Sequence, residues 1–237
     1  MLNRTSAILI TASAALGLAG CGSSGYVPKK QPEVTPVSEA GLTADVLLPL
    51  KPGSAWTYRV DTVIQNRSGV QPETGVMELR VAKYVKNGDV TNATLEFVRD
   101  NKVLDEQEWR IDKTGIYQIS SGTTRTKFSS PVPFLITPLV KDKITRWNGT
   151  GYTVLQKVGK ISSSIRLRGP EVVDTSLGKK SGIAVETLTE FTVGTVKGNT
   201  VSTTWFEPKV GIIRLRQAVT LPTGSVTTTL SLSKAPL

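Results

Sequence analysis

The chain has 237 residues, 38% of them hydrophobic, 6% aromatic and 20% charged, which is an ordinary composition for a globular protein. It has 29 Lys and Arg against 19 Asp and Glu, a net charge of +10, with no histidine and one cysteine. This composition excludes Ser-His-Asp and Cys-His nucleophiles, histidine zinc sites, disulfides within the chain and multi-cysteine metal sites.

The first twenty residues are typical of a targeting signal. Arg4 is the only charged residue before an apolar stretch at 7–18, which is far shorter than the ~20 residues needed to span a bilayer. The stretch ends in Leu18-Ala19-Gly20-Cys21, which resembles the bacterial lipobox. The small residues before the cysteine let a peptidase reach the backbone, and the thiol is a nucleophile that can be alkylated. The alternative is an ordinary secretory signal followed by an unrelated cysteine.

The lipobox resemblance implies cleavage between Gly20 and Cys21 and two or three acyl chains, palmitate among them, on Cys21. Each buried CH₂ contributes ~0.8 kcal/mol to membrane binding, so several chains form a stable anchor. Loss of Arg4 with the signal leaves 28 basic and 19 acidic side chains, a net charge of +9. We therefore expect a membrane-anchored protein of the cell envelope, outside the cytoplasm. Gly22 favours an outer membrane by resemblance to enterobacterial sorting, and the outer leaflet of the cytoplasmic membrane is the alternative.

Residues 21–45 are predicted to be the lipidated cysteine and a flexible tether, after a signal peptide at 1–20. The segment has no apolar periodicity and contains prolines at positions 28, 32 and 36. As a coil, the 24 residues after the cysteine would reach ~27 Å root-mean-square. Residues 38–42 are expected to form one helical turn at most.

Residues 46–237 are predicted to form one domain of about ten β-strands. Apolar and polar residues alternate with period two, as in Trp56-Thr57-Tyr58-Arg59-Val60-Asp61. The same alternation occurs around residues 77–85, 93–97, 109–112, 165–168, 183–193, 213–219 and 226–232. Turn residues separate the runs at 86–89, 99–102, 113–115, 197–199 and 222–224. The pattern indicates antiparallel strands with one dry face and one wet face.

The predicted fold class is all-β, with the strands in an antiparallel meander that forms a curved, half-open barrel-like sheet. A two-layer β-sandwich is the alternative, because a sheet with hardly any helix to cover it must curl on itself or form two layers. Residues 131–140 are predicted to be a loop packed over one opening, with Phe134, Leu135 and Ile136 as the cover of a ligand. The medium-sized Val, Ile, Leu and Thr of the inward face favour a ligand-accepting apolar cleft over a filled core.

Two segments carry a family resemblance. Pro49-Leu50-Lys51-Pro52-Gly53-Ser54-Ala55-Trp56-Thr57-Tyr58 opens the domain, and Trp205-Phe206-Glu207-Pro208-Lys209-Val210-Gly211-Ile212-Ile213-Arg214 lies near its end. Together they resemble a widespread group of uncharacterised bacterial envelope lipoproteins. The resemblance covers roughly residues 47–233, but only these twenty positions are distinctive. The segment that the group commonly carries between them, "vpaG-x-f", is replaced here by Ser176-Leu-Gly-Lys-Lys-Ser-Gly-Ile183.

The resemblance implies a β-rich fold similar to the open half-barrels of lipoprotein carriers, and it implies no assigned activity. From the residues themselves, Gly53 and Gly211 are predicted to be turn or bulge glycines. Trp56 and Trp205 are predicted to be core aromatics.

The motifs that point to enzymes lack the context that their chemistry requires. Ser176-Leu-Gly-Lys179 matches S-x-x-K and Lys113-Thr114-Gly115 matches K-T-G, but their order is reversed and no S-D-N is present. Glu186 and Glu190 would lie ~13 Å apart along one strand, too far for either glycosidase mechanism. We therefore predict a non-enzyme with no catalytic residue, no cofactor and no metal ligand.

Four arginines are predicted to lie on outward faces of strands: Arg166, Arg168, Arg214 and Arg216. In a protein tethered beside a membrane, they could contact anionic headgroups, lipopolysaccharide or wall polymers. The alternative is that they keep exposed strands soluble. A nucleic-acid partner is disfavoured by the location and because aromatic residues are not interleaved with the basic ones.

Two function classes remain open. In the first, the protein is a non-catalytic binding or carrier module for an apolar or amphiphilic ligand, such as a lipid, lipopolysaccharide or an acylated peptide. In the second, it is a structural or interaction protein of the envelope with a solid core.

The lipobox yields a direct prediction. Replacing Cys21 by Ser removes the thiol that would carry the acyl chains, so the variant is expected to leave the membrane fraction or to remain uncleaved. Membrane fractionation and mass spectrometry of the N-terminus measure both effects. A Cys21→Ser variant as firmly membrane-bound as the wild type, with no acyl mass on the wild type, contradicts it.

Overall fold

The structure, a computed structural model, describes residues 38–236. Within them lie one short helix, α1 (Ala44–Leu47), and twelve strands. The strands are β1 (Ala55–Asn66), β2 (Gly69–Asn87), β3 (Val90–Arg99), β4 (Lys102–Asp112), β5 (Gly115–Ser121), β6 (Thr126–Ile136), β7 (Ile144–Tyr152), β8 (Val158–Thr175), β9 (Gly178–Val193), β10 (Val196–Glu207), β11 (Gly211–Leu221) and β12 (Gly224–Lys234). Gly20 and Cys21 lie outside the described residues.

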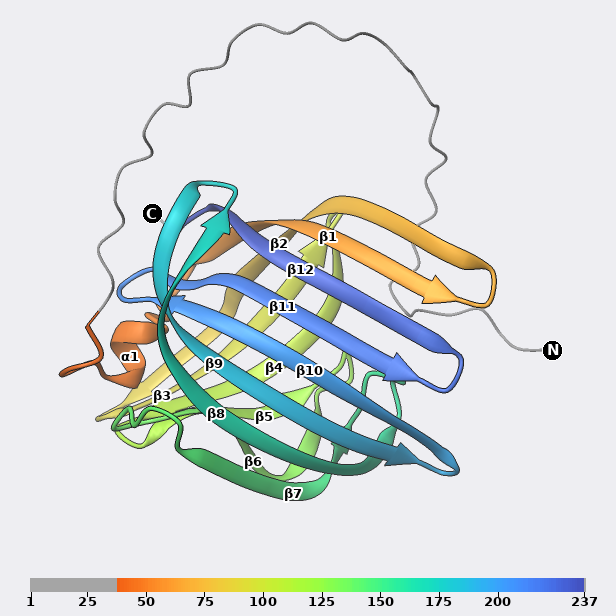
Figure 1. The fold of residues 1–237 in the computed structure, drawn as a ribbon. Helices are drawn as coiled ribbons and strands as arrows, with labels where there is room; N and C mark the ends of the chain where they lie inside the picture. Colours follow the sequence, from red (N-terminus) through yellow and green to blue (C-terminus); the bar gives the residue numbers. More distant parts are fainter. Residues whose placement is uncertain (1–37, 237) are drawn as a thin grey trace, which may run out of the picture.

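All twelve strands form one antiparallel sheet in the order β6-β5-β4-β3-β2-β1-β12-β11-β10-β9-β8-β7. Each half of the chain is a meander, and β1 joins them because it pairs with β2 on one edge and with β12 on the other. The sheet curls until its last strands, β6 and β7, lie against each other, which gives a nearly closed barrel (Figure 1). The predicted all-β, barrel-like sheet is confirmed, with twelve strands rather than about ten.

The loop predicted at 131–140 is wrong for its first six residues. Strand β6 extends to Ile136, and its residues Pro133 and Leu135 pair with β5. Proline argues against a central strand because it has no N–H for the ladder, but β6 has a ladder on one side only, so Pro131 and Pro133 are tolerated there. The connecting loop covers residues 137–143.

The turn predicted at 197–199 is also misplaced. The turn lies at residues 194–195, and Lys197, Gly198 and Asn199 pair with strand β9. Gly198 sits there because the Phe191 ring occupies the space that a side chain would need. A glycine that makes room for an aromatic ring looks the same in the sequence as a turn glycine.

The helix closes one end of the barrel. Residues 38–42, predicted to form a helical turn, form none; α1 follows two residues later, and Ala44 and Leu47 are fully buried. No side chain caps its first turn, but the Lys209 N–H donates to the Val46 carbonyl oxygen (2.7 Å), which ties it to the turn between β10 and β11. Packing therefore holds this short helix. The helix begins before residue 46, the predicted first residue of the domain.

The two segments that carry the family resemblance meet at this end. Trp56 Nε1 donates to the Val210 carbonyl oxygen (2.6 Å), and the Tyr58 hydroxyl donates to the Ile212 carbonyl oxygen (2.8 Å). Gly211 has a φ of 102° and lies directly against the Trp56 indole, where a Cβ would be crowded. Two side-chain hydrogen bonds, the one from Tyr58 buried and the one from Trp56 partly buried, thus join the opening strand to the hairpin near the C-terminus.

The Tyr58 contact can be tested through stability. Burial raises the pKa of the Tyr58 hydroxyl far above its ordinary value, so the group stays a neutral donor. Tyr58→Phe leaves the Ile212 carbonyl without this donor and should lower the free energy of unfolding by about 1–2 kcal/mol in urea denaturation. Tyr117→Phe, whose hydroxyl bonds to exposed Thr114, is the matched control and should change it by less than about 0.5 kcal/mol. Equal losses in the two variants would contradict the assignment.

Candidate functional site

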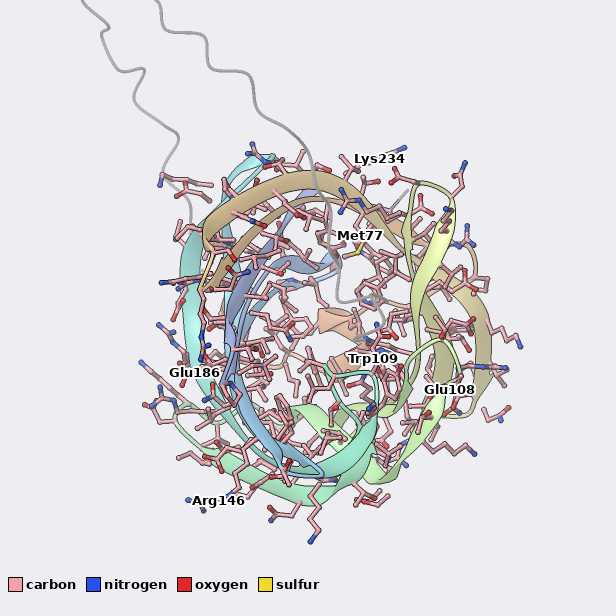
Figure 2. All side chains as sticks on the ribbon, turned by 90° about the vertical axis from the view of Figure 1, so that its right-hand side faces the viewer. Met77, Glu108, Trp109, Arg146, Glu186 and Lys234 are labelled. Atoms are coloured by element: carbon pink, nitrogen blue, oxygen red, sulfur yellow. The ribbon has the colours of Figure 1, made fainter. Side chains whose placement is uncertain are left out.

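The inner face of the barrel is packed with apolar side chains at the α1 end. Phe134 contacts Trp109 edge-on (ring centroids 4.8 Å apart) and Phe206 (6.0 Å), and Phe206 is fully buried. Figure 2 looks along the barrel, with Met77 and Trp109 toward the inside and α1 at the far end. We call this filled part the floor. It closes the interior at the α1 end.

One step farther from α1, a register row crosses six strands with polar side chains only. The row consists of Glu73, Thr62, Thr228, Gln217, Ser202 and Thr187, each paired with the next across β2, β1, β12, β11, β10 and β9. These side chains point inward, because Thr62 follows Trp56, Tyr58 and Val60 on the buried side of β1. We call this set the polar row.

Space remains beside the polar row. Thr228, Gln217 and Ser202 are only half-buried although the barrel surrounds them. In the next register row toward α1, Leu215 lies between the buried Thr204 and Leu230 and is also only half-buried. An inward side chain keeps accessible surface only where a water-sized space lies against it. The interior is therefore filled at the floor and open above it.

A second apolar cluster lies on the far side of the polar row from the floor. Its buried members are Trp147, Ile161 and Phe191, with the half-buried Phe128, Val132, Leu155 and Leu221 packed against them. The hydroxyls of Ser163 and Thr189 lie 2.9 Å apart on the inner face, between this cluster and the floor. The inner surface thus alternates between apolar and polar zones, whereas the sequence predicted an apolar cleft.

Three charged side chains belong to the inner face of β2–β4. Glu73 is part of the polar row, and the Arg99 guanidinium lies over Gly75, in the space that a Cβ there would take. Asp105 pairs in register with Phe97 and accepts hydrogen bonds from Gln107 Nε2 (2.6 Å) and the Gly122 N–H (2.7 Å). Gln107 Oε1 in turn accepts from Trp109 Nε1 (3.0 Å), so Asp105 is linked to the floor.

Hydrogen bonds hold Asp105 in the wall of the barrel. Burial raises the pKa of its carboxyl, and the hydrogen bonds from Gln107, Gly122 and Ser121 offset part of that rise. Among residues 38–236, no three Cys, Asp or Glu side chains gather as metal ligands. The hydrogen bond from the Gly122 N–H to Asp105 connects β4 to the turn between β5 and β6.

The predicted ligand cover lies in the wall and floor rather than above an opening. Phe134 belongs to the aromatic floor, Leu135 is fully buried in the core, and Ile136 is the last residue of β6. The pattern of hydrophobic residues around the prolines suggested a loop, and the edge position of β6 explains the difference.

The four predicted arginines do lie on outer faces, but acidic partners or backbone hold three of them. Arg166 pairs with Glu186 (2.8 Å), and Arg168 pairs with Glu171 (2.9 Å). Arg214 donates to the Asp174 carbonyl oxygen (2.9 Å) and lies over the buried Trp205 indole. Arg216 is exposed. The sequence missed both partners. Glu186 reaches Arg166 through the β8–β9 register, and Glu171 lies three residues after Arg168 on β8, where the register shifts after Leu167.

The outer face also has one open hollow, of about 550 Å³, over β7, β8 and β9. Its lining is mostly polar: Asn148, Gly149, Thr150, Lys160, Ile161, Ser162, Glu190 and Thr192. Along the described chain, no helix is long and apolar enough to cross a membrane.

No protein-family model matches the chain, and no curated protein matches it either. Solved structures with a similar fold include a presumed exported protein with a YmcC-like fold from Bacteroides fragilis (13% identity, TM-score 0.49, 80% of this chain and 99% of that one). A presumed lipoprotein from Parabacteroides distasonis shares 12% identity (TM-score 0.48, 80% and 98%). The hypothetical lipoprotein YmcC from Escherichia coli shares 10% (TM-score 0.37, 80% and 94%). Likenesses this distant do not assign the chain to a family.

Asp105 yields a prediction about pH. The pKa of Asp105 is raised in the folded state, so its ionisation destabilises the fold. Its contribution to the free energy of unfolding is therefore most favourable below about pH 4 and falls as pH rises through the folded-state pKa. Asp105→Asn removes that loss, so the variant should gain stability relative to the wild type between pH 4 and pH 7. Urea denaturation at four pH values measures the difference. A difference that stays constant or shrinks as pH rises would refute the assignment.

Proposed function

We propose that the protein is a lipid-anchored envelope protein that binds an amphiphilic ligand inside its barrel, without catalysis. The observation that carries this proposal is the incompletely packed part of the interior, where the half-buried Leu215 adjoins the polar row. Apolar surface next to hydroxyl and amide groups suits a ligand that has both an apolar and a polar part. A purely apolar ligand would offer no hydrogen bond to Gln217 and Ser202, the members of the polar row whose side chains keep accessible surface.

The alternative, a structural protein with a solid core, fits the floor but not the rest of the interior. A solid barrel of this kind would bury its inward side chains fully, as it does at Phe206 and Ile213. Leu215 and Gln217 are inward and keep accessible surface. These residues favour the binding module.

The first described residues lie at the α1 end of the barrel, which suits a membrane anchor on Cys21. Glu39 lies against Gly169 at the α1 end, close to the floor, and sixteen residues separate Cys21 from Ser38, where the described chain begins. An anchor there would leave the polar row and its accessible side chains away from the point of attachment.

The proposal predicts saturable binding of a fluorescent long-chain fatty acid to the full chain carrying Cys21→Ser, which has no acyl chains of its own to compete. Leu215→Asn removes apolar surface from the inner face and should weaken binding by about fivefold or more, since fivefold corresponds to about 1 kcal/mol. Fluorescence titration measures it.

The matched control is Leu188→Asn. Leu188 is also a strand leucine, but it lies on the outer face and is 43% exposed, so its replacement should leave the affinity unchanged. Absence of saturable binding, or equal effects of the two substitutions, would leave the structural protein as the better account.

A further inference from the structure

Strands β6 and β7 meet without a backbone ladder between them, unlike the eleven neighbouring pairs of the described sheet. Side chains hold them together instead. Trp147 Nε1 donates to Ser130 Oγ (2.9 Å), and the Thr150 N–H donates to Ser129 Oγ (3.0 Å). Phe128 packs edge-on against Trp147, with ring centroids 6.1 Å apart. We call this contact the seam.

The β6 side of the seam is also loosely held to β5. Lys127 pairs with Ser120, and the next paired residue, Val132, pairs with Gln118. Residues 128–131 therefore bulge out of the β5–β6 ladder at the point where they contact β7. A segment with few backbone hydrogen bonds separates from its neighbours at lower free-energy cost than the rest of a sheet.

Glycines on β7 make room for the side chains of β6. A Cβ at Gly149 would overlap Ser129 Oγ, and a Cβ at Gly151 would overlap the Phe128 ring. The Phe128 ring fills the gap that Gly151 leaves in the seam. Rotation about the side-chain bonds of Phe128 can move the ring out of that gap. Behind it lies the inner apolar cluster around Trp147 and Phe191.

Toward α1, where β6 and β7 diverge into loop 137–143, the seam ends in a small cavity of about 20 Å³. Its lining is apolar apart from one hydroxyl and one ammonium group: Leu135, Ile136, Pro138, Val140, Lys143, Thr145, Ile165, Leu167 and Val185. Its volume holds no more than one water-sized group, so an acyl chain could enter only if the strands part.

We propose that the seam is the port through which a single-chain amphiphile with an anionic head enters the barrel. This inference rests on the proposed function and names its route and its ligand class. The tail would pass between β6 and β7 from the cavity toward the inner apolar cluster. Lys143, at the rim of the cavity, would hold the head while the tail enters.

The charges around the cavity support an anionic head. Lys141 and Lys143 are exposed on the loop, with Asp142 between them, and the Lys141 side chain runs beside Gly169 near Glu39. Arg166 on the neighbouring strand β8 is already paired with Glu186. Val140 is 48% exposed beside the two lysines, so an apolar surface borders the cations, as an amphiphile requires.

A reversible lock across the seam tests the route. In the full chain with Cys21→Ser, Ser129→Cys together with Gly149→Cys places two thiols where Ser129 Oγ and the Gly149 backbone now touch. Oxidation should slow association of the fluorescent fatty acid, followed by stopped flow, by more than tenfold, and reduction should restore it. Because the oxidised and reduced forms have the same sequence, any packing effect of the substitutions is present in both.

The matched control is Ser176→Cys together with Ser231→Cys, whose hydroxyls lie 3.4 Å apart on the outer face, away from the seam. Its oxidation should not change the rate. If the locked seam takes up the fatty acid as fast as the reduced form, the port is elsewhere and this inference is wrong while the binding proposal stands. If the reduced protein binds no fatty acid, the binding proposal fails and the port with it.

Lys143→Gln tests the ligand class. It should slow association of the anionic fatty acid about threefold at low salt and leave its uncharged methyl ester unaffected, because a charge at the rim acts mainly on the association rate. Lys127→Gln, at the other end of β6, is the control and should slow neither. Equal effects on acid and ester, or no effect on either, would remove the anionic head from the proposal.

Discussion

The fold depends on one constraint: a twelve-stranded antiparallel sheet with a single four-residue helix must bury its apolar face against itself. The sheet meets this constraint by curling until β6 reaches β7, and the β1–β12 pairing makes the curl continuous by joining the two halves of the chain. Eleven ladders satisfy the backbone, while side chains close the last gap. The strength of the barrel is therefore uneven around its circumference, and its weakest contact is fixed by topology.

The polar row explains why the interior does not fill. Burying hydroxyl and amide groups is costly unless they find hydrogen-bond partners. Some do, such as Ser163 with Thr189, but Gln217 and Ser202 keep accessible surface beside space for water. The floor can be dense because Trp56 and Tyr58 reach backbone carbonyls there. One end of the barrel is thus a solid core, whereas inward side chains farther from α1 keep accessible surface.

The sequence predicted much of the fold because period-two alternation is strong where one face is dry, as around Trp56 and Tyr58. It failed where local signals had a second meaning: the prolines of β6 are tolerated at an edge, and Gly198 makes room for a ring. The candidate site was predicted less well. Threonine is common on either face of a strand, so the sequence does not show which way a residue such as Thr228 points. The polar row becomes visible only when the register of the strands is known. The outward position of Arg166 was predicted, but its partner Glu186 is twenty residues away.

The central claim is that backbone hydrogen bonds close this sheet on every side except between β6 and β7. Amide hydrogen exchange, resolved by residue, tests it most directly. The account predicts that the amides of Phe128, Ser129 and Ser130 exchange about a hundredfold or more faster than those of the β8–β9 ladder, at residues such as Val185 and Thr187. Protection at residues 128–130 equal to that of the β8–β9 ladder would mean that a backbone ladder closes the seam, and would contradict the account.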